Sequence, residues 1–363
     1  MNLSQGIYWD QSWSPIRGCS HASPGCDHCW AERMAARFSD CWTCENKRID
    51  QHQTCSGGPK HHPAPFHNFA TSAGWTGRVE LIESELLKPL HWKKPRVVAL
   101  NWMGDLFHES LPESDILSVL QTIGKCPRHW FIILTKRAQR MREILSRRRW
   151  RNLGHSPAMD GDHYVSLLPG EHRESDSSFL PNVILGVSVE DRQRADERIP
   201  GLLQTPAACR MVSVEPMLGA IEGIELGRGY LTGQAHDNAP YNGKHLDWVV
   251  CGGESGPGAR PMHPDWVRGL RDQCWTASVP FFWKGWGEFS PVGLLSAHQE
   301  IVCGADGWHA PVGDVGALSI HHMARHNSEM ECPPLQNMYR IGKKAAGRLL
   351  DGRTWDELPE VLR

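Results

Sequence analysis

Residues 183–203 read VILGVSVEDRQRADERIPGLL, a continuously apolar run at 183–189 followed by a polar segment with helical spacing. A run of this kind fits a strand covered on both faces, which is typical of parallel sheets. The same order of apolar run and helical segment recurs about six times along the chain. The other apolar runs lie at residues 7–9, 97–100, 130–134, 211–214, 248–251 and 279–283.

The helical segments between these runs complete a repeated strand–helix pattern. We expect helices at residues 31–38, 80–90, 113–123, 138–149, 192–203 and 264–273. The alternation predicts an α/β fold, a partial (β/α) barrel of about six parallel strands, with an open doubly wound sheet as the alternative.

Three stretches interrupt the repeated strand–helix pattern. Residues 40–75 are rich in Cys, His, Gly and Pro, and residues 153–180 and 225–245 are polar, so we expect long loop insertions there. The strand–helix pattern is also absent after residue 289. We therefore predict a barrel at 1–289 that carries the cysteine-rich insertion, and an irregular extension at 290–363 that closes on the barrel.

Composition bounds the class of protein. With 363 residues, 40% apolar and 22% charged, the chain is long and apolar enough to bury a large core. Its 39 basic and 41 acidic side chains nearly cancel, so any nucleic-acid site has to be a local patch. No apolar run approaches the length of a membrane span, and the first residues lack the pattern of a secretory signal, so we expect a cytoplasmic protein without a membrane partner.

Polar side chains follow each apolar run at the point where the predicted strand ends. Carboxyl ends of parallel strands carry the chemistry of α/β enzymes, although a few such residues, Ser188 among them, could instead cap helices. The motif SVE occurs twice, at 188–190 and 213–215, in the same position after a strand. The candidate catalytic residues are Asp105, Glu190, Glu215 and Lys284. The candidate cofactor-binding residues are Asn101, Asp105, Lys136, Arg137, Ser188 and Glu190.

The sharpest motif is WSPIRGCSHASPGCDHCWAERMAARF at residues 13–38, where Cys19, Cys26 and Cys29 form C-x6-C-x2-C. Thiols in the cytosol are kept reduced, so clustered cysteines indicate a metal or catalytic site. A structural zinc site is normally closed by four protein ligands, whereas three cysteines leave one position open. The alternative is a zinc site in which His21 or His28 is the fourth ligand.

A second cysteine group follows within the insertion. Cys41, Cys44 and Cys55 form C-x2-C-x10-C with several histidines nearby, and the x2 pair is a common half of a zinc site. The alternative is an exposed loop whose cysteines have no shared role.

Several further motifs support a resemblance that covers residues 8–359. Together with the cysteine motif, NWMGDLFHE, VSVEPMLG and DWVVCGGESGPGARPM resemble the block motifs of a widespread phage and bacterial protein family of unknown function, named after two mycobacteriophage gene products. The family implies a partial, TIM-barrel-like fold with a three-cysteine motif similar to that of radical S-adenosylmethionine (radical SAM) enzymes. Those enzymes usually have C-x3-C-x2-C, so the first gap is longer here.

The resemblance to radical SAM enzymes implies specific cofactors. Cys19, Cys26 and Cys29 would bind three irons of a 4Fe-4S cluster, and S-adenosylmethionine would chelate the fourth. An electron from the cluster would cleave the sulfonium bond and release a 5′-deoxyadenosyl radical. Such an enzyme needs an electron donor such as flavodoxin, and a partner protein is a further expectation.

Residues 136–151 carry eight basic side chains and one acidic one. Such a run near the strand ends predicts contact with phosphates, although a solvated face is the usual interpretation. The candidate nucleic-acid-binding residues are Arg140, Arg147, Arg148 and Arg149.

Together these features predict a radical SAM-type iron-sulfur enzyme that acts on a nucleotide or nucleic-acid substrate. The first alternative is a zinc-stabilised protein that binds or processes nucleic acid without radical chemistry. The second is a barrel hydrolase with Asp105, Glu190 and Glu215 around a divalent ion.

Overall fold

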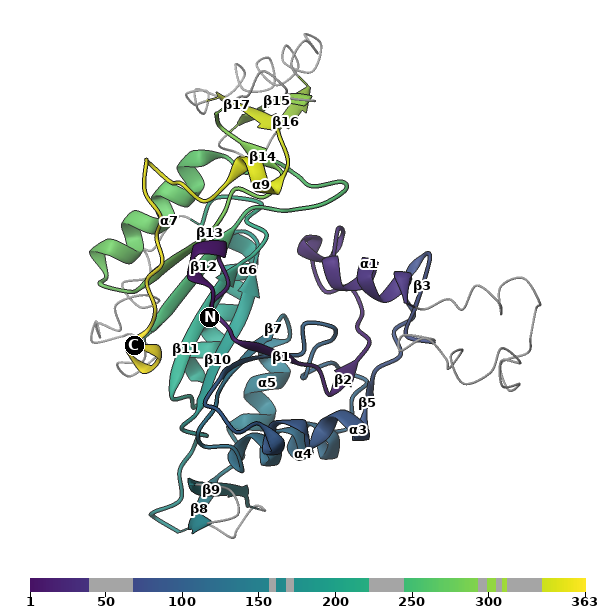
Figure 1. The fold of residues 1–363 in the computed structure, drawn as a ribbon, viewed down its shortest axis with the longest axis vertical. Coiled ribbons are helices and arrows are strands. Elements are labelled where there is room, and N and C mark those ends of the chain that lie inside the picture. The colour runs from purple at the N-terminus through teal and green to yellow at the C-terminus, as the bar shows by residue number, and fades with distance from the viewer. Residues whose placement is uncertain are drawn as a thin grey trace, which may run out of the picture. The chain divides into compact units, whose positions relative to one another are not determined.

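The computed structural model describes residues 1–38, 68–156, 161–167, 173–221, 245–292, 299–304, 309–311 and 335–363. The fold is α/β, with a seven-stranded parallel sheet curled into a half-barrel and helices between the strands (Figure 1). This confirms the predicted fold class, with one strand more than the six expected. The strand order is β1 (Gln11–Trp13), β6 (Val97–Leu100), β7 (Trp130–Thr135), β10 (Val183–Val189), β11 (Cys209–Val214), β12 (Trp248–Gly252) and β13 (Phe281–Gly285).

Most predicted strands lie within two residues of their expected positions, but the first does not. The prediction of a strand at residues 7–9 was wrong, because β1 begins at Gln11 and pairs with β6 from Gln11↔Val98 onward. Tyr8 is fully buried, but it packs its ring on the rings of Trp248 and Phe282. Its apolar character therefore reflects ring packing and not strand pairing.

Four of the six predicted helices match their ranges to within three residues. The helix predicted at 138–149 ends at Leu145, and the helix predicted at 80–90 does not form. Residues 80–90 form a short strand, β5 (Glu80–Leu81), and two single-turn helices, α3 (Glu83–Leu86) and η3 (Lys88–His91), because Pro89 cannot continue an α-helix. No helix in the described part of the chain is long and apolar enough to cross a membrane. The long helices are α1 (Trp30–Arg37), α4 (Glu113–Gly124), α5 (Ala138–Leu145), α6 (Arg192–Gln204) and α7 (Pro264–Thr276).

Small antiparallel sheets occupy two regions that the sequence pattern left irregular. A hairpin of β8 (Trp150–Ser156) and β9 (Gly161–Ser166) replaces the start of the loop predicted at 153–180. Trp150, at the hairpin's base, is buried, which gives this polar segment an apolar anchor. After residue 289 a four-stranded sheet has the order β14 (Phe289–Ser290), β17 (Leu335–Arg340), β15 (Gln299–Gly304) and β16 (His309–Pro311).

The remaining elements are short. They are η1 (Leu3–Gln5), β2 (Ile16–Arg17), η2 (Pro24–Cys26), β3 (Ala70–Thr71), β4 (Gly74–Trp75), α9 (Lys343–Ala346) and η4 (Glu360–Leu362). β2 pairs with β5, and β3 pairs with β4.

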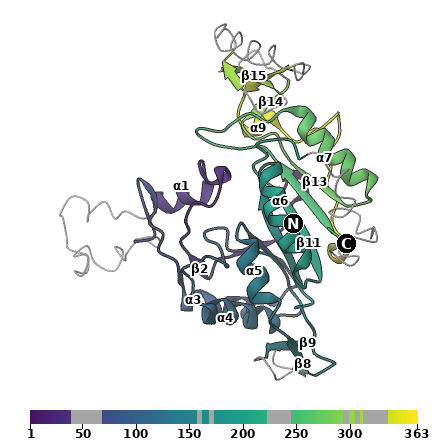
Figure 2. The same ribbon diagram turned by 180° about the vertical axis from the view of Figure 1, so that it is seen from behind.

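The chain divides into two compact units, each with its own core. Unit 1 comprises Met1, residues 9–185 and 205–208, and unit 2 comprises residues 2–8, 186–204 and 209–363. In unit 1 all four residues of β6 are buried, as is Phe131 of β7. In unit 2 the rings of Tyr8 and Trp248 meet edge to face at 4.9 Å, and Figure 2 shows α6 lying along β11.

Gly253 follows β12 directly and lies against the chain after β13. A Cβ at this position would lie 2.1 Å from the carbonyl oxygen of Trp286. No real Cβ approaches a backbone atom so closely, so any side chain here has to push two segments of unit 2 apart.

We expect Gly253→Ala to lower the free energy of unfolding by at least ~2 kcal/mol, as overpacking against backbone does. The matched control is Gly269→Ala in α7, where nothing lies within 4 Å of the added Cβ. That change should stabilise the protein slightly, because alanine is the better helix former. Urea unfolding of both variants measures the difference, and equal midpoints would contradict the close approach.

Candidate functional site

The three motif cysteines lie in unit 1, in the loop between β2 and α1. Pro24 starts the single-turn helix η2 (Pro24–Cys26), and a Pro-Gly pair such as Pro24 and Gly25 favours a turn. Cys29 is the N-cap residue of α1, and its backbone N–H donates to the carbonyl of Cys26. Proline suits the first position of a helix because it lacks the N–H that would be unpaired there. The sequence therefore determines the local shape of this loop.

The three cysteines are close enough for their charges to interact, because Cys26 raises the pKa of both Cys19 and Cys29. Cys26 is buried and the other two are partly exposed. Within the described ranges, no three His, Cys, Asp or Glu side chains are grouped closely enough to hold a metal ion. Binding of a metal centre therefore has to draw these sulfurs together.

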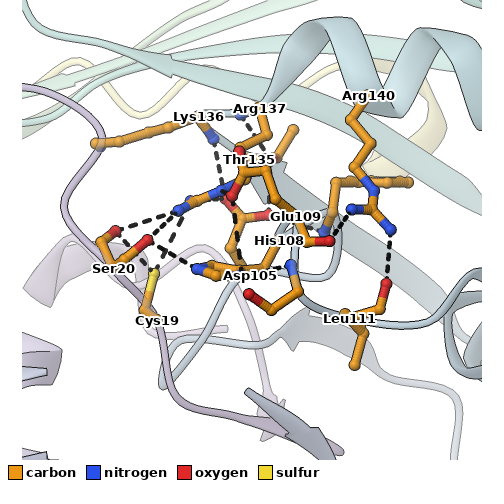
Figure 3. Close-up of polar contacts among 12 residues, drawn as sticks. Cys19, Ser20, Asp105, His108, Glu109, Leu111, Thr135, Lys136, Arg137 and Arg140 are labelled. Carbon is orange, nitrogen blue, oxygen red and sulfur yellow. Dashed lines mark hydrogen bonds and ion pairs between the residues drawn. The ribbon is translucent and has the colours of Figure 1, made fainter. Parts of the chain in front are cut away.

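Arg137, which directly precedes α5, connects the cysteine loop to the ends of β6 and β7 (Figure 3). Its Nη1 donates to Asp105 at 3.0 Å and to the sulfur of Cys19 at 3.9 Å. Its Nη2 donates to the carbonyl and hydroxyl oxygens of Ser20, and its Nε donates to Glu109 at 2.8 Å. These five contacts match the five N–H groups of a guanidinium. The predicted role of Arg137 was a cofactor contact, but its donors are engaged within the protein.

Asp105 is the acceptor on which this network converges. Its buried carboxylate accepts from the hydroxyl of Thr135 at 2.7 Å and from the backbone N–H groups of Phe107 and Lys136. A buried carboxylate is tolerated when hydrogen bonds and a cation compensate for lost hydration. Asp105, a predicted catalytic and cofactor residue, thus positions Arg137 and the end of β7.

His108 and Ser20 were not among the predicted site residues, although both lie within motifs that carry the resemblance. The Nδ1 atom of His108 accepts from the backbone N–H of Ser110, so the neutral ring carries its proton on Nε2. That Nε2 lies 2.8 Å from the hydroxyl of Ser20 and donates to it. Burial, followed by the charge of Arg137, lowers the pKa of His108. His108 therefore positions Ser20, and it does not act as a base toward it.

Burial favours the neutral form of two of these thiols, those of Cys19 and Cys29. It raises the pKa of Cys19 to about 12, with Asp105 adding to the rise and Arg137 opposing it. Burial also raises the pKa of Cys29, and the nearby Lys136 ammonium opposes that rise. Without a metal these thiols stay protonated near neutral pH, and a bound cation has to displace the protons.

Asn101 directly follows β6 and contacts β2, the strand that leads into the cysteine loop. Its Oδ1 accepts from the backbone N–H of Ile16, and its backbone has a left-handed φ of 55°, which asparagine tolerates better than most residues. Its Nδ2 is buried and has no hydrogen-bond partner within the described ranges. An unpaired buried donor costs free energy, so this atom is suited to an acceptor from water or a ligand.

One of the two histidines considered as a fourth zinc ligand, His21, contacts α1. The Nε2 of His21 lies 2.9 Å from Glu32, whose other oxygen accepts from the backbone N–H of Trp75. These contacts tie the loop and α1 to β4. The second cysteine group, Cys41, Cys44 and Cys55, lies outside the described residues.

All four candidate nucleic-acid-binding arginines contact other residues of the protein. Arg140 donates to the carbonyl oxygens of Glu109 and Leu111, and Arg148 pairs with Glu113. Arg149 donates to the carbonyl of Arg148. Arg147 pairs with Glu113 at 3.2 Å, but 60% of its side chain is exposed. The helix α5 ends before these last residues, so they do not form one helical basic face.

Unit 2 holds the remaining predicted residues. Glu190 is fully buried and pairs at 3.2 Å with Arg198 of α6, which also donates to the carbonyl of Ser188. This buried pair ties α6 to the end of β10. Glu215 and Lys284 form a second pair at 2.8 Å.

One comparison with known proteins assigns a family. The model of a family described as a protein of unknown function (DUF5131) matches residues 4–359, so the chain belongs to that family. No curated protein and no solved structure matches the chain.

We expect Arg137→Gln to lower the free energy of unfolding of the metal-free protein by about 3–5 kcal/mol, because Asp105 is left as a buried, unpaired charge. The double variant Arg137→Gln/Asp105→Asn should recover part of that loss. Denaturant unfolding measures both.

The matched control for this prediction is Arg147→Gln, which removes an exposed arginine from a surface pair and should cost less than about 1 kcal/mol. If the two single variants lose equal stability, Arg137 does not anchor the loop.

Proposed function

We propose that the protein is an iron-sulfur enzyme of the radical SAM type, in which Cys19, Cys26 and Cys29 hold a 4Fe-4S cluster. The observation that carries the proposal is a loop with three thiols, held at the ends of β6 and β7 by Arg137, on a parallel half-barrel. Active sites of parallel barrels lie at the carboxyl ends of the strands.

The chemistry of the donor set supports this cofactor. Three thiols bind three irons and leave the fourth for a small molecule. The guanidinium of Arg137 and the ammonium of Lys136 lie beside Cys19 and Cys29, and cations favour thiolate over thiol. The N-terminus of α1 favours negative charge at Cys29 in the same way.

The chain's own residues have defined tasks around such a cluster. Arg137 donates a hydrogen bond to Cys19, and Asp105 and Ser20 keep the guanidinium in place. Asn101 offers a buried amide donor. When bound, a cluster with S-adenosylmethionine would supply the electron for cleavage of the sulfonium bond, and the protein orients the reactants and excludes water.

A nucleotide or nucleic acid is the proposed substrate class. Arg147 supports it, because 60% of its side chain is exposed beyond the end of α5 and its positive charge attracts phosphate. An electron donor such as flavodoxin, and a cytoplasmic location, belong to the same proposal.

Anaerobic reconstitution of the full chain with iron and sulfide tests the function. We expect about four irons per chain and an absorption band at about 400 nm in the wild type. Cys19→Ser, Cys26→Ser and Cys29→Ser should each lose the band and the formation of 5′-deoxyadenosine from S-adenosylmethionine. Cys126→Ala, a buried cysteine outside the loop, is the control and should keep both.

The alternatives give different results in the same experiment. A zinc-stabilised protein would take up a colourless metal and would not cleave S-adenosylmethionine. A hydrolase that uses Asp105, Glu190 or Glu215 would keep its activity in Cys19→Ser. Either result would refute the radical enzyme.

A further inference from the structure

Unit 2 places two oppositely charged side chains at the carboxyl ends of neighbouring strands. Glu215 directly follows β11, and Lys284 lies near the end of β13. Between these strands lies β12, which ends at Gly252. The proposed iron-sulfur chemistry in unit 1 does not use any of these residues.

Glu215 and Lys284 meet across the intervening strand because position 252 has no side chain. Their strands are separated by two spacings of about 4.8 Å each. Even so, the Nζ of Lys284 lies 2.8 Å from the Oε2 of Glu215. A Cβ at Gly252 would lie 3.3 Å from the Cβ of Lys284 and 3.6 Å from the Oε1 of Glu215. The two side chains therefore occupy the space above this glycine.

A β-bulge directs Lys284 toward this space. The register pairs Cys251 with Trp283 and Gly252 with Gly285, so Lys284 is the extra residue on β13. Bulges redirect side chains and are frequent beside functional sites. The ring of Tyr8 lies 5.6 Å from the Nζ of Lys284 and is itself fully buried. The ammonium is thus supported from one side by an aromatic ring.

The pair is partly exposed, and one oxygen of Glu215 lacks a hydrogen bond in the described part of the chain. The side chains of Lys284 and Glu215 are 24% and 20% exposed. The Oε1 of Glu215 is buried and accepts no hydrogen bond within the described ranges. A group that completes this site has to donate to a carboxylate and accept from an ammonium. A hydroxyl does both, whereas a protonated amine cannot accept and a fully ionised phosphate cannot donate.

We propose that Glu215 and Lys284 bind a sugar hydroxyl, and specifically the 2′-hydroxyl of a ribonucleoside. The choice of a nucleoside rests on the proposed function, while the choice of a hydroxyl rests on the geometry of the pair. The 2′-hydroxyl is both donor and acceptor, and proteins use it to distinguish ribose from deoxyribose. The site thus selects ribonucleotides over deoxyribonucleotides.

The test measures thermal unfolding of the metal-free protein with millimolar adenosine, guanosine, cytidine or uridine, and with the four 2′-deoxynucleosides. A ligand that binds only the native state raises the midpoint in proportion to its affinity. We expect at least one ribonucleoside to bind about tenfold or more tightly than its 2′-deoxy form, the loss typical of a hydrogen bond to a charged group.

Two variants assign the effect to this pair. Glu215→Gln/Lys284→Met removes both charges with similar side-chain shapes, which avoids a buried unpaired charge, and it should abolish the preference for ribose. Gly252→Ala adds a methyl group between the two side chains and should weaken binding. The control pair Arg268→Met/Asp351→Asn removes an exposed ion pair of unit 2 and should bind as the wild type does.

The proposal is overturned if no ribonucleoside binds, if both sugars bind equally, or if the double variant keeps the preference. Because these measurements use protein without metal, they are independent of cluster assembly. Failure of the proposed iron-sulfur function would show as absent iron and absent 5′-deoxyadenosine in the reconstituted protein. The preference for ribose would remain in that case.

Discussion

The buried ion pair between Arg137 and Asp105 is the interaction on which the cysteine loop depends. Neither charge is stable in the interior alone, so each requires the other together with several hydrogen bonds. The pair also spans three parts of unit 1, because Asp105 follows β6, Arg137 follows β7, and the guanidinium reaches Cys19 and Ser20. A loop with little secondary structure thereby acquires a defined position at the strand ends.

In unit 2, backbone geometry brings Glu215 and Lys284 together. The contact between Glu215 and Lys284 requires free space above Gly252 and a bulge that turns Lys284. Gly253, the next residue, allows the chain after β13 to pass at backbone distance. The two adjacent glycines therefore have different roles. Gly252 leaves room for two side chains to meet, and Gly253 lets two backbone segments pack closely.

The apolar runs predicted six of the seven strands, since burial on both faces requires apolar residues throughout a central strand. The failures have physical causes. The run at residues 7–9 is buried by ring packing of Tyr8, and Pro89 breaks the helix expected at 80–90. The catalytic and cofactor-binding roles of Asp105 and Arg137 stay predictions. What the sequence pattern did not show is that their side chains bond to each other and to neighbouring residues.

The sequence by itself determined the α/β class, the turn at Pro24, and the position of Cys29 at the start of α1, because these depend on local spacing and backbone preference. Only the tertiary structure decided that Ser20 contacts His108 and that Glu215 contacts Lys284, residues 88 and 69 positions apart. Such contacts depend on how strands pair and where a bulge falls. The chemistry of the side chains alone does not show which residues meet, because the chain contains many other serines, histidines, glutamates and lysines that could form the same contacts.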